Sequence, residues 1–575
     1  MSTAATEARP VTVNLYESRR DQMFPQLTAR QIARLEPHGK RVSIRQGDIL
    51  VETGDRSRQF LVILSGSVEI VRPGIAGEEL VVVHQPGGFA GEMNMLRGLG
   101  SLVRARVRES GEVLAIDEDQ LRVLVQTDAE LSELFMRAFI LRRMGLVASQ
   151  QGDVVVIGSR HCASTLRVQQ FLTRNNFPYM GIDLDSDPTV QSLLDRFHVS
   201  VEDIPVVLCR GEKVLRHPTN ERLAACLGMN PQLDDSVIHD VIVVGAGPAG
   251  LASAVYGASE GLDVLVLEST APGGQAGSSS KIENYLGFPT GISGQALASR
   301  ALVQSQKFGA SVNVAVHAVA LRCTRRPYSI ELSDGRVVHS RTVVIACGAQ
   351  YRKLDIENLA RFEGLGIYYA ATHLEAKFCG GEEVAIIGGG NSAGQAAVFL
   401  SSSCRHVHIL VRSHGLSDTM SRYLIRRIEE SPNITLHAHT EITAFAGAER
   451  LERVTWWNKS NDKTDTRDIG HVFLMTGAVP NTRWLQGCVA LDEKGFIRSA
   501  TELHEDELAA LGWPLPRQPY HLETTLPGIF AVGDVRSGSV KRIASAVGEG
   551  SVCIQFAHRA LHESPALSQA VAAGA

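Results

Sequence analysis

The sequence predicts a multidomain chain that begins with a β-roll, continues with a small α/β domain, and ends with two larger α/β domains. Three observations support this prediction. Short strands separated by glycines fill residues 23–116, and strands then alternate with helices over residues 153–228. Further along, two glycine-rich turns at Gly245 and Gly388 each join an apolar strand to a helix of small residues. The length of 575 residues has room for roughly three to five domains.

Composition and charge exclude several classes of protein. Hydrophobic residues make up 44% and charged residues 21% of the chain, which is ordinary for a soluble protein. A net charge of -5 gives no indication of a nucleic-acid partner. Apolar runs such as 342–347 are far too short to cross a membrane, and residues 1–25 contain no apolar signal core. The nine cysteines are scattered, with no CxxC and no metal-ligand spacing. We therefore expect a reducing, cytoplasmic compartment and no metal, nucleic-acid or membrane partner.

The N-terminal part is expected to be an antiparallel β-roll followed by a helix. The expected strands lie at residues 47–50, 60–64, 65–70, 80–83 and 113–116. Residues 118–147 have the apolar period of a helix, which could transmit the state of the roll or simply form a packing face.

The order of these strands, together with the pair Gly91-Glu92, resembles the cyclic-nucleotide-binding domain family. The resemblance implies that Glu92 binds the ribose 2'-hydroxyl and that an arginine about ten positions later pairs with the cyclic phosphate. In this chain that position falls on Leu102 or Val103, and Arg104 lies slightly out of register. A one-residue shift turns a strand side chain to the opposite face. Two alternatives stay open: a cyclic nucleotide bound by Gly91, Glu92 and Arg104, or a degenerate sensor kept as an interaction module.

Residues 153–228 show the strand and helix order of a small α/β unit. Strands are expected at 154–157, 179–184 and 204–208, and helices at 165–174 and 190–197. The unit resembles the thioredoxin/glutaredoxin family, with Cys162-Ala-Ser-Thr165 at the nucleophile motif and Pro205 as the expected cis-proline. Cys162 would precede a helix N-terminus, which stabilises a thiolate. Because Thr165 replaces the resolving cysteine, the domain has either a monothiol role or a docking role.

The first glycine-rich turn has the pattern of a dinucleotide cradle. Gly245 permits the tight turn, Gly247 lets the backbone approach a pyrophosphate, and Gly250 allows the helix to pack against the strand. The next strand, 264–267, ends at Glu268, where a ribose hydroxyl would be accepted. We therefore expect a dinucleotide at this turn.

The second turn, Gly388-x-Gly390-x-x-Ala393, repeats the pattern and indicates a nicotinamide dinucleotide. No acidic residue stands at the end of its second strand, where one would favour NADH. The residue there is Arg412, which could pair with the 2'-phosphate of NADPH together with Arg422. NADPH is therefore favoured, and NADH stays an alternative.

From residue 240 onward the chain resembles the low-molecular-weight thioredoxin reductase family, in which a split FAD domain surrounds an NADPH domain. The resemblance rests on both glycine motifs and on the stretches 273–275, 283–285, 342–348 and 528–534. It implies a homodimer, rotation of the inserted domain, and a set of cofactor-binding residues. For FAD these are Gly245, Gly247, Gly250, Glu268, Gly274, Gln275, Asn284, Gly348, Gly533, Asp534, Arg542 and Ile543, and for the nicotinamide dinucleotide Gly388, Gly390, Asn391, Ser392, Ala393 and Arg412.

The chain departs from that family at one decisive position. Where the family carries Cys-Ala-Thr-Cys, this sequence reads Ala370-Ala-Thr-His373, so neither sulfur is present. The candidate catalytic residues are Cys162 and His373. Three functions compete: hydride transfer from NAD(P)H through FAD to a quinone, dioxygen, redox protein or external disulfide; thiol exchange through Cys162 or an external thiol; and a flavin-loaded regulator without turnover.

The predicted domain boundaries follow from these motifs. They are 1–150 for the cyclic-nucleotide-binding-like β-roll with its C-terminal helices, 151–235 for the thioredoxin-like domain, 236–355 and 481–575 for the two parts of the FAD domain, and 356–480 for the NAD(P)H domain. A sensor roll placed before a redox module indicates that a cyclic nucleotide could regulate it.

Overall fold

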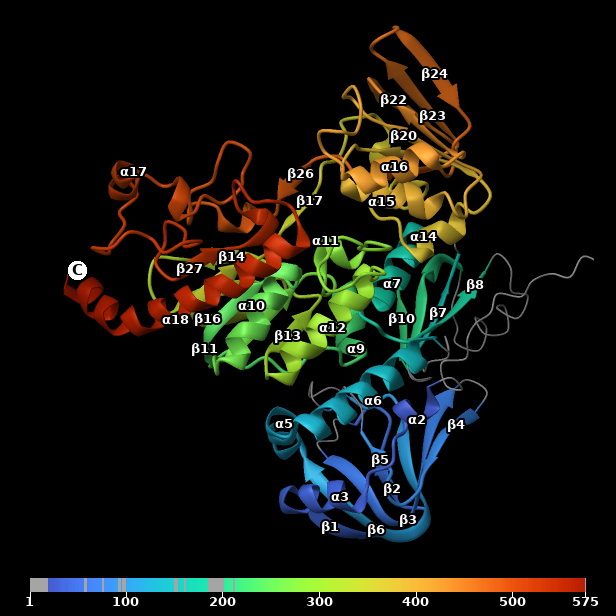
Figure 1. Ribbon diagram of the computed structural model, residues 1–575, viewed down its shortest axis with the longest axis vertical. Coiled ribbons are helices and arrows are strands. Elements are labelled where there is room, and N and C mark those ends of the chain that lie inside the picture. The colour runs from blue at the N-terminus through green and yellow to red at the C-terminus, as the bar shows by residue number, and fades with distance from the viewer. Residues whose placement is uncertain are drawn as a thin grey trace, which may run out of the picture. The chain divides into compact units, whose positions relative to one another are not determined.

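The computed structural model divides the chain into two compact units (Figure 1). It describes residues 19–55, 59–74, 77–91, 95, 100–148, 154–159, 162–184, 201–209 and 213–573. Unit 1 comprises Met1–Val154 with Pro178–Met180, and unit 2 comprises Val155–Phe177 with Gly181–Ala575. The helix predicted at 190–197 and the candidate ligand Glu92 lie outside the described residues.

Unit 1 contains the predicted β-roll. Its strands are β1 (Lys40–Ile44), β2 (Ile49–Val51), β3 (Gln59–Gly74), β4 (Gly77–His84), β5 (Phe89–Ala90) and β6 (Arg104–Asp117), preceded by α2 (Arg20–Met23) and α3 (Ala29–Leu35). The antiparallel order is β1-β6-β3-β4, with β2 on β6 and β5 on β3. β3 is continuous where the sequence predicts two strands. Its register against β6 shifts on both sides of Ser65, so the bulge absorbs Gly66 without ending the strand.

Two helices follow the roll where the sequence predicts one. They are α5 (Glu118–Thr127) and α6 (Ala129–Ala148). The break falls at Asp128, whose extended backbone ends α5 and whose carboxylate accepts a hydrogen bond from Leu131 N at 3.0 Å. An aspartate at this position caps a new helix, and apolar periodicity does not register a one-residue break. Phe135 and Phe139 of α6 pack on Phe60 and Phe89 of the roll.

The small α/β domain has the predicted thioredoxin-like order. It consists of β7 (Val154–Gly158), α7 (Ala163–Arg174), β8 (Met180–Asp183), η2 (Val201–Asp203), β9 (Val206–Cys209), β10 (Lys213–Arg216) and α9 (Asn220–Cys226), with sheet order β10-β9-β7-β8. The Ile204–Pro205 bond is cis, as predicted. Cys162 occupies the N-cap position of α7.

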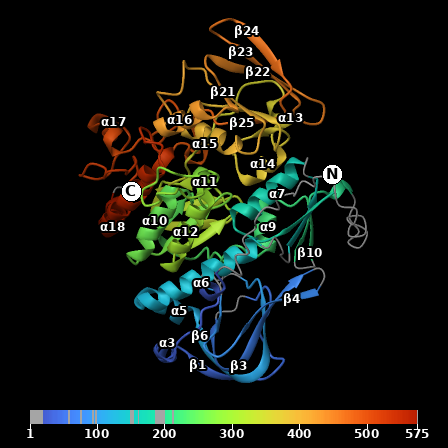
Figure 2. The same ribbon diagram turned by 45° about the vertical axis from the view of Figure 1, so that its right-hand side comes forward.

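The first nucleotide-binding domain is built on a seven-stranded sheet with the order β13-β12-β11-β16-β15-β14 and with β27 on β16. The strands are β11 (Ile238–Val244), β12 (Val264–Glu268), β13 (Ser311–Val314), β14 (Ala318–Arg322), β15 (Tyr328–Leu332), β16 (Val337–Ile345) and β27 (Ile529–Ala531). The helices are α10 (Pro248–Ser259), α11 (Gly274–Gly277), α12 (Gly294–Lys307), α17 (Glu505–Ala510) and α18 (Ile543–Ala573). Figure 2 shows α18 running beside α10, and residues of both helices share one buried apolar core with the sheet.

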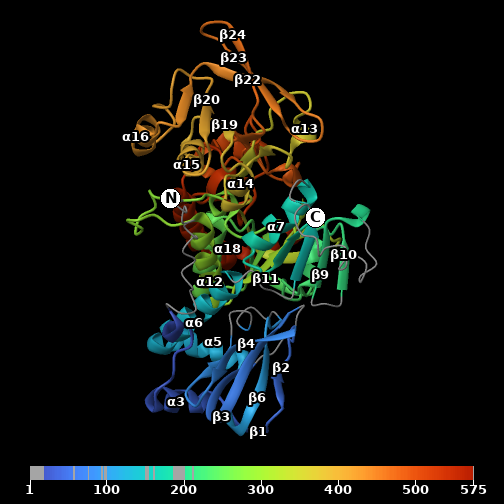
Figure 3. The ribbon, with the colours of Figure 1, turned by 90° about the vertical axis from the view of Figure 1, so that its right-hand side faces the viewer.

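The second nucleotide-binding domain is inserted between β16 and β27. Its parallel sheet has the order β18-β25-β19-β20-β21, and a smaller sheet, β22-β23-β24, extends from it (Figure 3). The strands are β18 (Ile367–Tyr368), β19 (Glu383–Ile387), β20 (His406–Leu410), β21 (Ile434–His437), β22 (Thr440–Ala446), β23 (Arg453–Asn458), β24 (Lys463–Arg467) and β25 (His471–Leu474). The helices are α13 (Leu359–Phe362), α14 (His373–Phe378), α15 (Asn391–Leu400) and α16 (Arg422–Glu430). The antiparallel pair β17 (Ala349–Tyr351) and β26 (Ala478–Pro480) forms the two connections between the domains.

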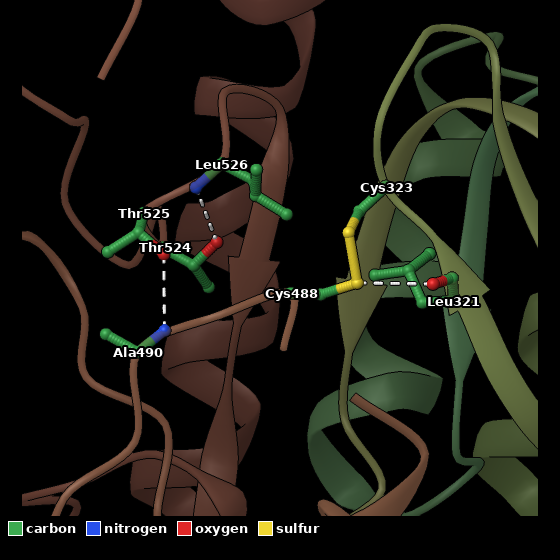
Figure 4. The surroundings of a disulfide bond; sticks show 7 residues. All are labelled: Leu321, Cys323, Cys488, Ala490, Thr524, Thr525 and Leu526. Atoms are coloured by element: carbon green, nitrogen blue, oxygen red, sulfur yellow. Dashed lines mark hydrogen bonds between the residues drawn. A yellow bond between two sulfur atoms is a disulfide. The ribbon is translucent and has the colours of Figure 1, made fainter. Parts of the chain in front are cut away.

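The structure contains a disulfide that the scattered cysteine spacing did not predict. Cys323, just after β14, is bonded to Cys488, which follows the short helix η3 (Arg483–Leu485) (Figure 4). The two residues are 165 positions apart. Spacing along the sequence carries no information about such a pair, because the fold alone brings the two segments together. The disulfide fastens the chain after β26 to the edge of the first sheet.

Candidate active site

The first glycine motif forms the turn that the sequence predicts. Gly245 has φ 105°, and a Cβ there would lie 2.4 Å from the carbonyl oxygen of Ala346. Gly247 is the N-cap of α10, and a Cβ on Gly250 would lie 1.8 Å from the oxygen of Gly245. The turn therefore requires its glycines, and it leaves the N-terminus of α10 open to a pyrophosphate.

Glu268 ends β12 and closes this turn. Its carboxylate accepts hydrogen bonds from the backbone amides of Ala246 at 2.8 Å, Thr270 at 2.8 Å and Ala271 at 3.2 Å. A carboxylate has about four acceptor positions. The bonds to the turn hold Glu268 in place and leave it capacity to accept from a ribose hydroxyl, the role predicted for it.

Asp534 lies directly after Gly533, and both residues line the same cavity as Glu268. Burial raises the pKa of its carboxyl group, with Lys541 acting in the opposite direction. Lys541 Nζ donates to the carbonyl oxygen of Asp534 at 3.0 Å, and Gly533 N donates to Glu549 Oε2 at 2.6 Å. A buried carboxylate with an inward-facing backbone is suited to accept from a polar chain such as the ribityl group of FAD.

The second glycine motif joins β19 to α15. Gly388 has φ 143°, and a Cβ there would lie 2.3 Å from the oxygen of Met475. The Asn391 side chain accepts from Ser421 N at 2.7 Å, which fixes the start of α15. Ala393 is fully buried against the sheet, and Arg412 follows β20 on the exposed surface.

A single cavity of about 1480 Å³ brings most of the predicted residues together. Its predicted lining residues are Gly245, Gly247, Glu268, Gly274, Gln275, Asn284, Gly348, His373, Asn391, Ser392, Gly533, Asp534, Arg542 and Ile543. Six of the predicted catalytic and dinucleotide-binding residues are outside this lining: Cys162, Gly250, Gly388, Gly390, Ala393 and Arg412. The glycines and the alanine among them belong to the two glycine-rich turns or to the first turn of the helix that follows. The two glycine-rich turns, with the helix N-termini behind them and the carboxylates of Glu268 and Asp534, fit two dinucleotides.

The Ala370–His373 segment lies on this cavity and is held by a helix cap. Thr372 is the N-cap of α14: its Oγ1 accepts from Leu374 N at 3.2 Å, and Glu375 Oε2 accepts from Thr372 N at 2.8 Å. The His373 ring packs edge-on against Phe399, with centroids 5.1 Å apart. Local capping thus keeps the backbone in place without any sulfur.

Cys347 is the one thiol on the cavity wall in the described part of the chain. It donates to the carbonyl oxygen of Asn481 at 3.0 Å. Burial raises the pKa of the Cys347 thiol to about 12. A neutral, hydrogen-bonded thiol is a poor nucleophile, because the thiolate is the reactive form.

Sequence reasoning missed a charged cluster on the same wall. Glu363 Oε2 accepts from Lys353 Nζ at 2.8 Å, and Glu363 Oε1 accepts from Tyr369 Oη at 2.6 Å. Burial works against ionisation of Glu363, but these two hydrogen bonds hold its pKa below the ordinary value. Burial and Glu363 raise the pKa of Tyr369, so its hydroxyl stays protonated. The three residues belong to no motif, and only the fold shows that they meet.

The thioredoxin-like domain contributes α7 to the cavity. Ala163 lies on the cavity wall, and a Cβ on Gly364 would lie 2.8 Å from the Ala163 methyl group. Gln170 Nε2 donates to Glu375 Oε1 at 2.6 Å, so α7 and α14 are adjacent (Figure 1). Cys162 is half-buried at the start of α7, one residue away from the wall.

The candidate ligand residues of the β-roll are only partly described. Glu92 is outside the described residues, and Gly91 accepts a hydrogen bond at its carbonyl oxygen from Arg142 Nη1 at 2.7 Å. Arg104 Nε donates to both oxygens of Glu52, at 2.9 and 3.0 Å, and its Nη1 pairs with Glu78. Both carboxylates form ion pairs with the Arg104 guanidinium group, which was the candidate partner of a cyclic phosphate.

Two parts of the chain match known protein families. Residues 239–550 match the family described as pyridine nucleotide-disulphide oxidoreductase. Residues 41–128 match the family described as cyclic nucleotide-binding domain. These matches confirm the predicted resemblances of the N-terminal roll and of the C-terminal part, and the predicted fold class of both; the thioredoxin-like resemblance of residues 153–228 stays a prediction.

Individual proteins match the C-terminal part of the chain. Thioredoxin reductase of Mycoplasma genitalium is 32% identical over 324 residues, which cover 56% of this chain and 94% of that protein. A protein named NADH dehydrogenase, from Ferdinandcohnia aciditolerans, is 28% identical over 60% of this chain and 63% of its own length. The crystal structure of Lactococcus lactis thioredoxin reductase in its FR conformation matches with TM-score 0.51 and 26% identity, covering 56% of this chain and 99% of that one.

Two features of the described residues concern membrane insertion and metal binding. No helix there has the length and apolar character required to cross a bilayer. No group of three or more His, Cys, Asp or Glu side chains in those residues is arranged to hold a metal ion.

Proposed function

The chain belongs to the pyridine nucleotide-disulphide oxidoreductase family and is an FAD-dependent NAD(P)H oxidoreductase, and on that premise we propose that its electrons pass to an acceptor from outside the chain. The proposal rests on one observation: the segment Ala370–His373, which lines the cavity, carries no sulfur. Exchange with a disulfide needs an attacking thiolate and a second thiol to close the ring. Cys347, a single thiol with a raised pKa and a hydrogen bond to Asn481, does not provide this pair.

The residues of the chain have distinct tasks in this reaction. When bound, FAD supplies the electron carrier and NAD(P)H supplies the hydride. Asn391 and Ser392 hold the nicotinamide dinucleotide at the start of α15, and Arg412 favours NADPH through its 2'-phosphate. Glu268 and Asp534, which both line the cavity, would accept from hydroxyl groups of FAD.

The cluster Lys353, Glu363 and Tyr369 suits an acceptor that takes up protons with its electrons. A quinone is such an acceptor: quinone, NAD(P)H and one proton give quinol and NAD(P)⁺. Tyr369 stays protonated, and Glu363 accepts hydrogen bonds from both Tyr369 and Lys353. Tyr369 and Lys353 can therefore both hold protons on the cavity wall where the acceptor would enter. The match to a protein named NADH dehydrogenase supports an acceptor other than a disulfide.

Anaerobic reduction with NADPH, followed by addition of one oxidant at a time, tests the proposal. We expect the flavin absorbance to bleach with NADPH and to return with a water-soluble quinone, while a small disulfide leaves it bleached. Cys162→Ser should behave as the wild-type protein with every oxidant. Rapid return of colour with the disulfide in both proteins would contradict an acceptor other than a disulfide.

A second function is favoured by the position of Cys162. This thiol caps α7 one residue from the cavity wall, so it could exchange with an external disulfide as a monothiol. Disulfide turnover that is present in the wild-type protein and lost in Cys162→Ser would support this function over the first.

Regulation by the β-roll is a separate proposal. The family match supports a cyclic nucleotide as the ligand, and Arg104 would have to leave Glu52 and Glu78 in order to bind the phosphate. Calorimetry with cyclic AMP and cyclic GMP tests it. Heat release with one of them supports regulation, and no heat with either supports a degenerate sensor.

A further inference from the structure

The C-terminal end of α7 is fastened to the FAD domain. Gln295 Nε2 donates to the carbonyl oxygen of Thr173 at 2.6 Å. Asn176 Nδ2 donates to Ser299 Oγ at 2.6 Å and its Oδ1 accepts from Gln295 Nε2 at 3.0 Å. Gln295 and Ser299 both belong to α12, so the last turn of α7 has a defined position on the FAD domain.

Arg174 is the last residue of α7, and its side chain enters the FAD cavity. Its Nη2 donates to the carbonyl oxygen of Gly274 at 3.0 Å. Its Nε is buried and has no hydrogen-bond partner among the residues that the structure describes. Burial lowers the pKa of Arg174, and the carboxylates of Glu268 and Glu375 act against that shift. The guanidinium group is charged, lines the cavity and is bonded to a carbonyl oxygen, so a further acceptor in the cavity would offset the cost of its partial burial.

The position of Arg174 indicates which acceptor that is. Gly274 lies beside the first cradle, since a Cβ on Gly274 would be 3.1 Å from the Cα of Gly247. Gly247 caps α10, where the motif places a pyrophosphate, and Glu268 is the acceptor for the adjoining ribose. A guanidinium group matches phosphate oxygens in charge and in geometry.

We propose that Arg174 is an FAD-binding residue, contributed by the thioredoxin-like domain, that donates to the adenosine diphosphate half of the cofactor. The proposal rests on FAD binding in the cavity, as the proposed function does. It gives the thioredoxin-like domain a role that needs no thiol chemistry: the domain completes the cofactor site.

Arg167 provides a matched control on the same helix. It also lies on the cavity wall, but its guanidinium group donates to Asn220 Oδ1 at 3.0 Å and to the carbonyl oxygen of Pro218 at 2.8 Å, within its own domain. Asn176→Gly is the control for docking, because it removes two of the three hydrogen bonds to α12 described above and glycine tolerates the φ of 53° found there.

The experiment measures FAD affinity of the full-length protein after removal of flavin, by quenching of FAD fluorescence, for wild type and for Arg174→Met, Arg174→Lys, Arg167→Met and Asn176→Gly. We expect Arg174→Met to raise the Kd for FAD about ten- to hundred-fold, as for loss of a charged hydrogen bond to phosphate, and Arg174→Lys to have a smaller effect. Both control variants should stay within about threefold of wild type.

The melting temperature, with and without FAD, is the second readout. The flavin-free Arg174→Met protein should melt no lower than flavin-free wild type, because its buried charge is gone, and FAD should raise its melting temperature less. Equal FAD affinity in wild type and Arg174→Met would overturn the proposal, and so would an equal loss in Asn176→Gly, which would show that docking alone matters. A wild-type protein that binds no FAD would instead overturn the flavin assignment itself.

Discussion

Two glycines of α18 provide a controlled test of how the FAD domain is packed. Gly548 and Gly550 are two positions apart in the same helix. A Cβ on Gly548 would meet nothing within 4 Å, whereas one on Gly550 would lie 2.2 Å from the carbonyl oxygen of Ala249 and 3.0 Å from the Cβ of Ala252, both in α10. The Gly550 carbonyl oxygen also accepts from Ser253 Oγ at 3.1 Å. We predict opposite effects of alanine at the two positions.

The expected magnitudes follow from helix propensity and overpacking. Alanine in place of glycine stabilises a helix by about 0.8–1.0 kcal/mol, and both variants gain this amount. The Gly550→Ala methyl group cannot fit unless α18 moves away from α10, and overpacking of this kind destabilises by about 1–3 kcal/mol. Because the helix gain is common to both variants, the difference between them isolates the clash. Gly548→Ala should be the more stable variant by about 1–3 kcal/mol.

The assay follows the release of FAD on heating, by the rise of flavin fluorescence, together with the melting temperature of the whole chain. Flavin release reports on the FAD site rather than on the whole chain, which matters because a multidomain chain does not unfold in two states. We expect Gly548→Ala to release FAD at or above the wild-type temperature and Gly550→Ala several degrees below it. Equal release temperatures in the two variants would refute the close packing of α18 on α10.

Three further predictions concern other parts of the chain. Burial lowers the pKa of His84 to about 3, so this histidine is protonated in the unfolded chain at a higher pH than in the folded β-roll. The free energy of unfolding of the β-roll should therefore fall as the pH is lowered from about 6.5 towards 3, by about 2 kcal/mol at pH 5. Thermal unfolding measured over a pH series should show a weaker acid dependence in His84→Gln. Iodoacetamide should modify Cys162 of the native protein well before Cys347, whose thiol has a pKa raised to about 12. Mass spectrometry that finds Cys347 modified first would contradict a neutral, hydrogen-bonded thiol at that position. Without reductant, Cys488→Ser should lower the free energy of unfolding by about 2–4 kcal/mol, and Cys323→Ser should lower it by the same amount. A variant as stable as the wild-type protein would show that the disulfide adds nothing to stability.

The sequence predicted the nucleotide-binding parts well because their signals are local. A strand, a glycine turn and a helix follow one another within about thirty residues, so the cradle at Gly245 and the acid at Glu268 can be recognised without the fold. The same reasoning identified Cys162 as the cap of α7 and Ala370–His373 as a segment on the cavity. Apolar periodicity was less informative at Asp128, where one capping residue divides a predicted helix into two.

By itself, then, the sequence determined the order of the domains, the two cradles and the loss of the sulfur pair at Ala370–His373. Only the tertiary structure brought Lys353, Glu363 and Tyr369 to one wall, joined Cys323 to Cys488, and placed Arg174 beside the FAD cradle. The physical reason is the range of the interactions. Glycine turns and helix caps depend on neighbouring residues, whereas a shared cavity wall depends on how separate elements pack, and the residues of any one element do not specify that arrangement.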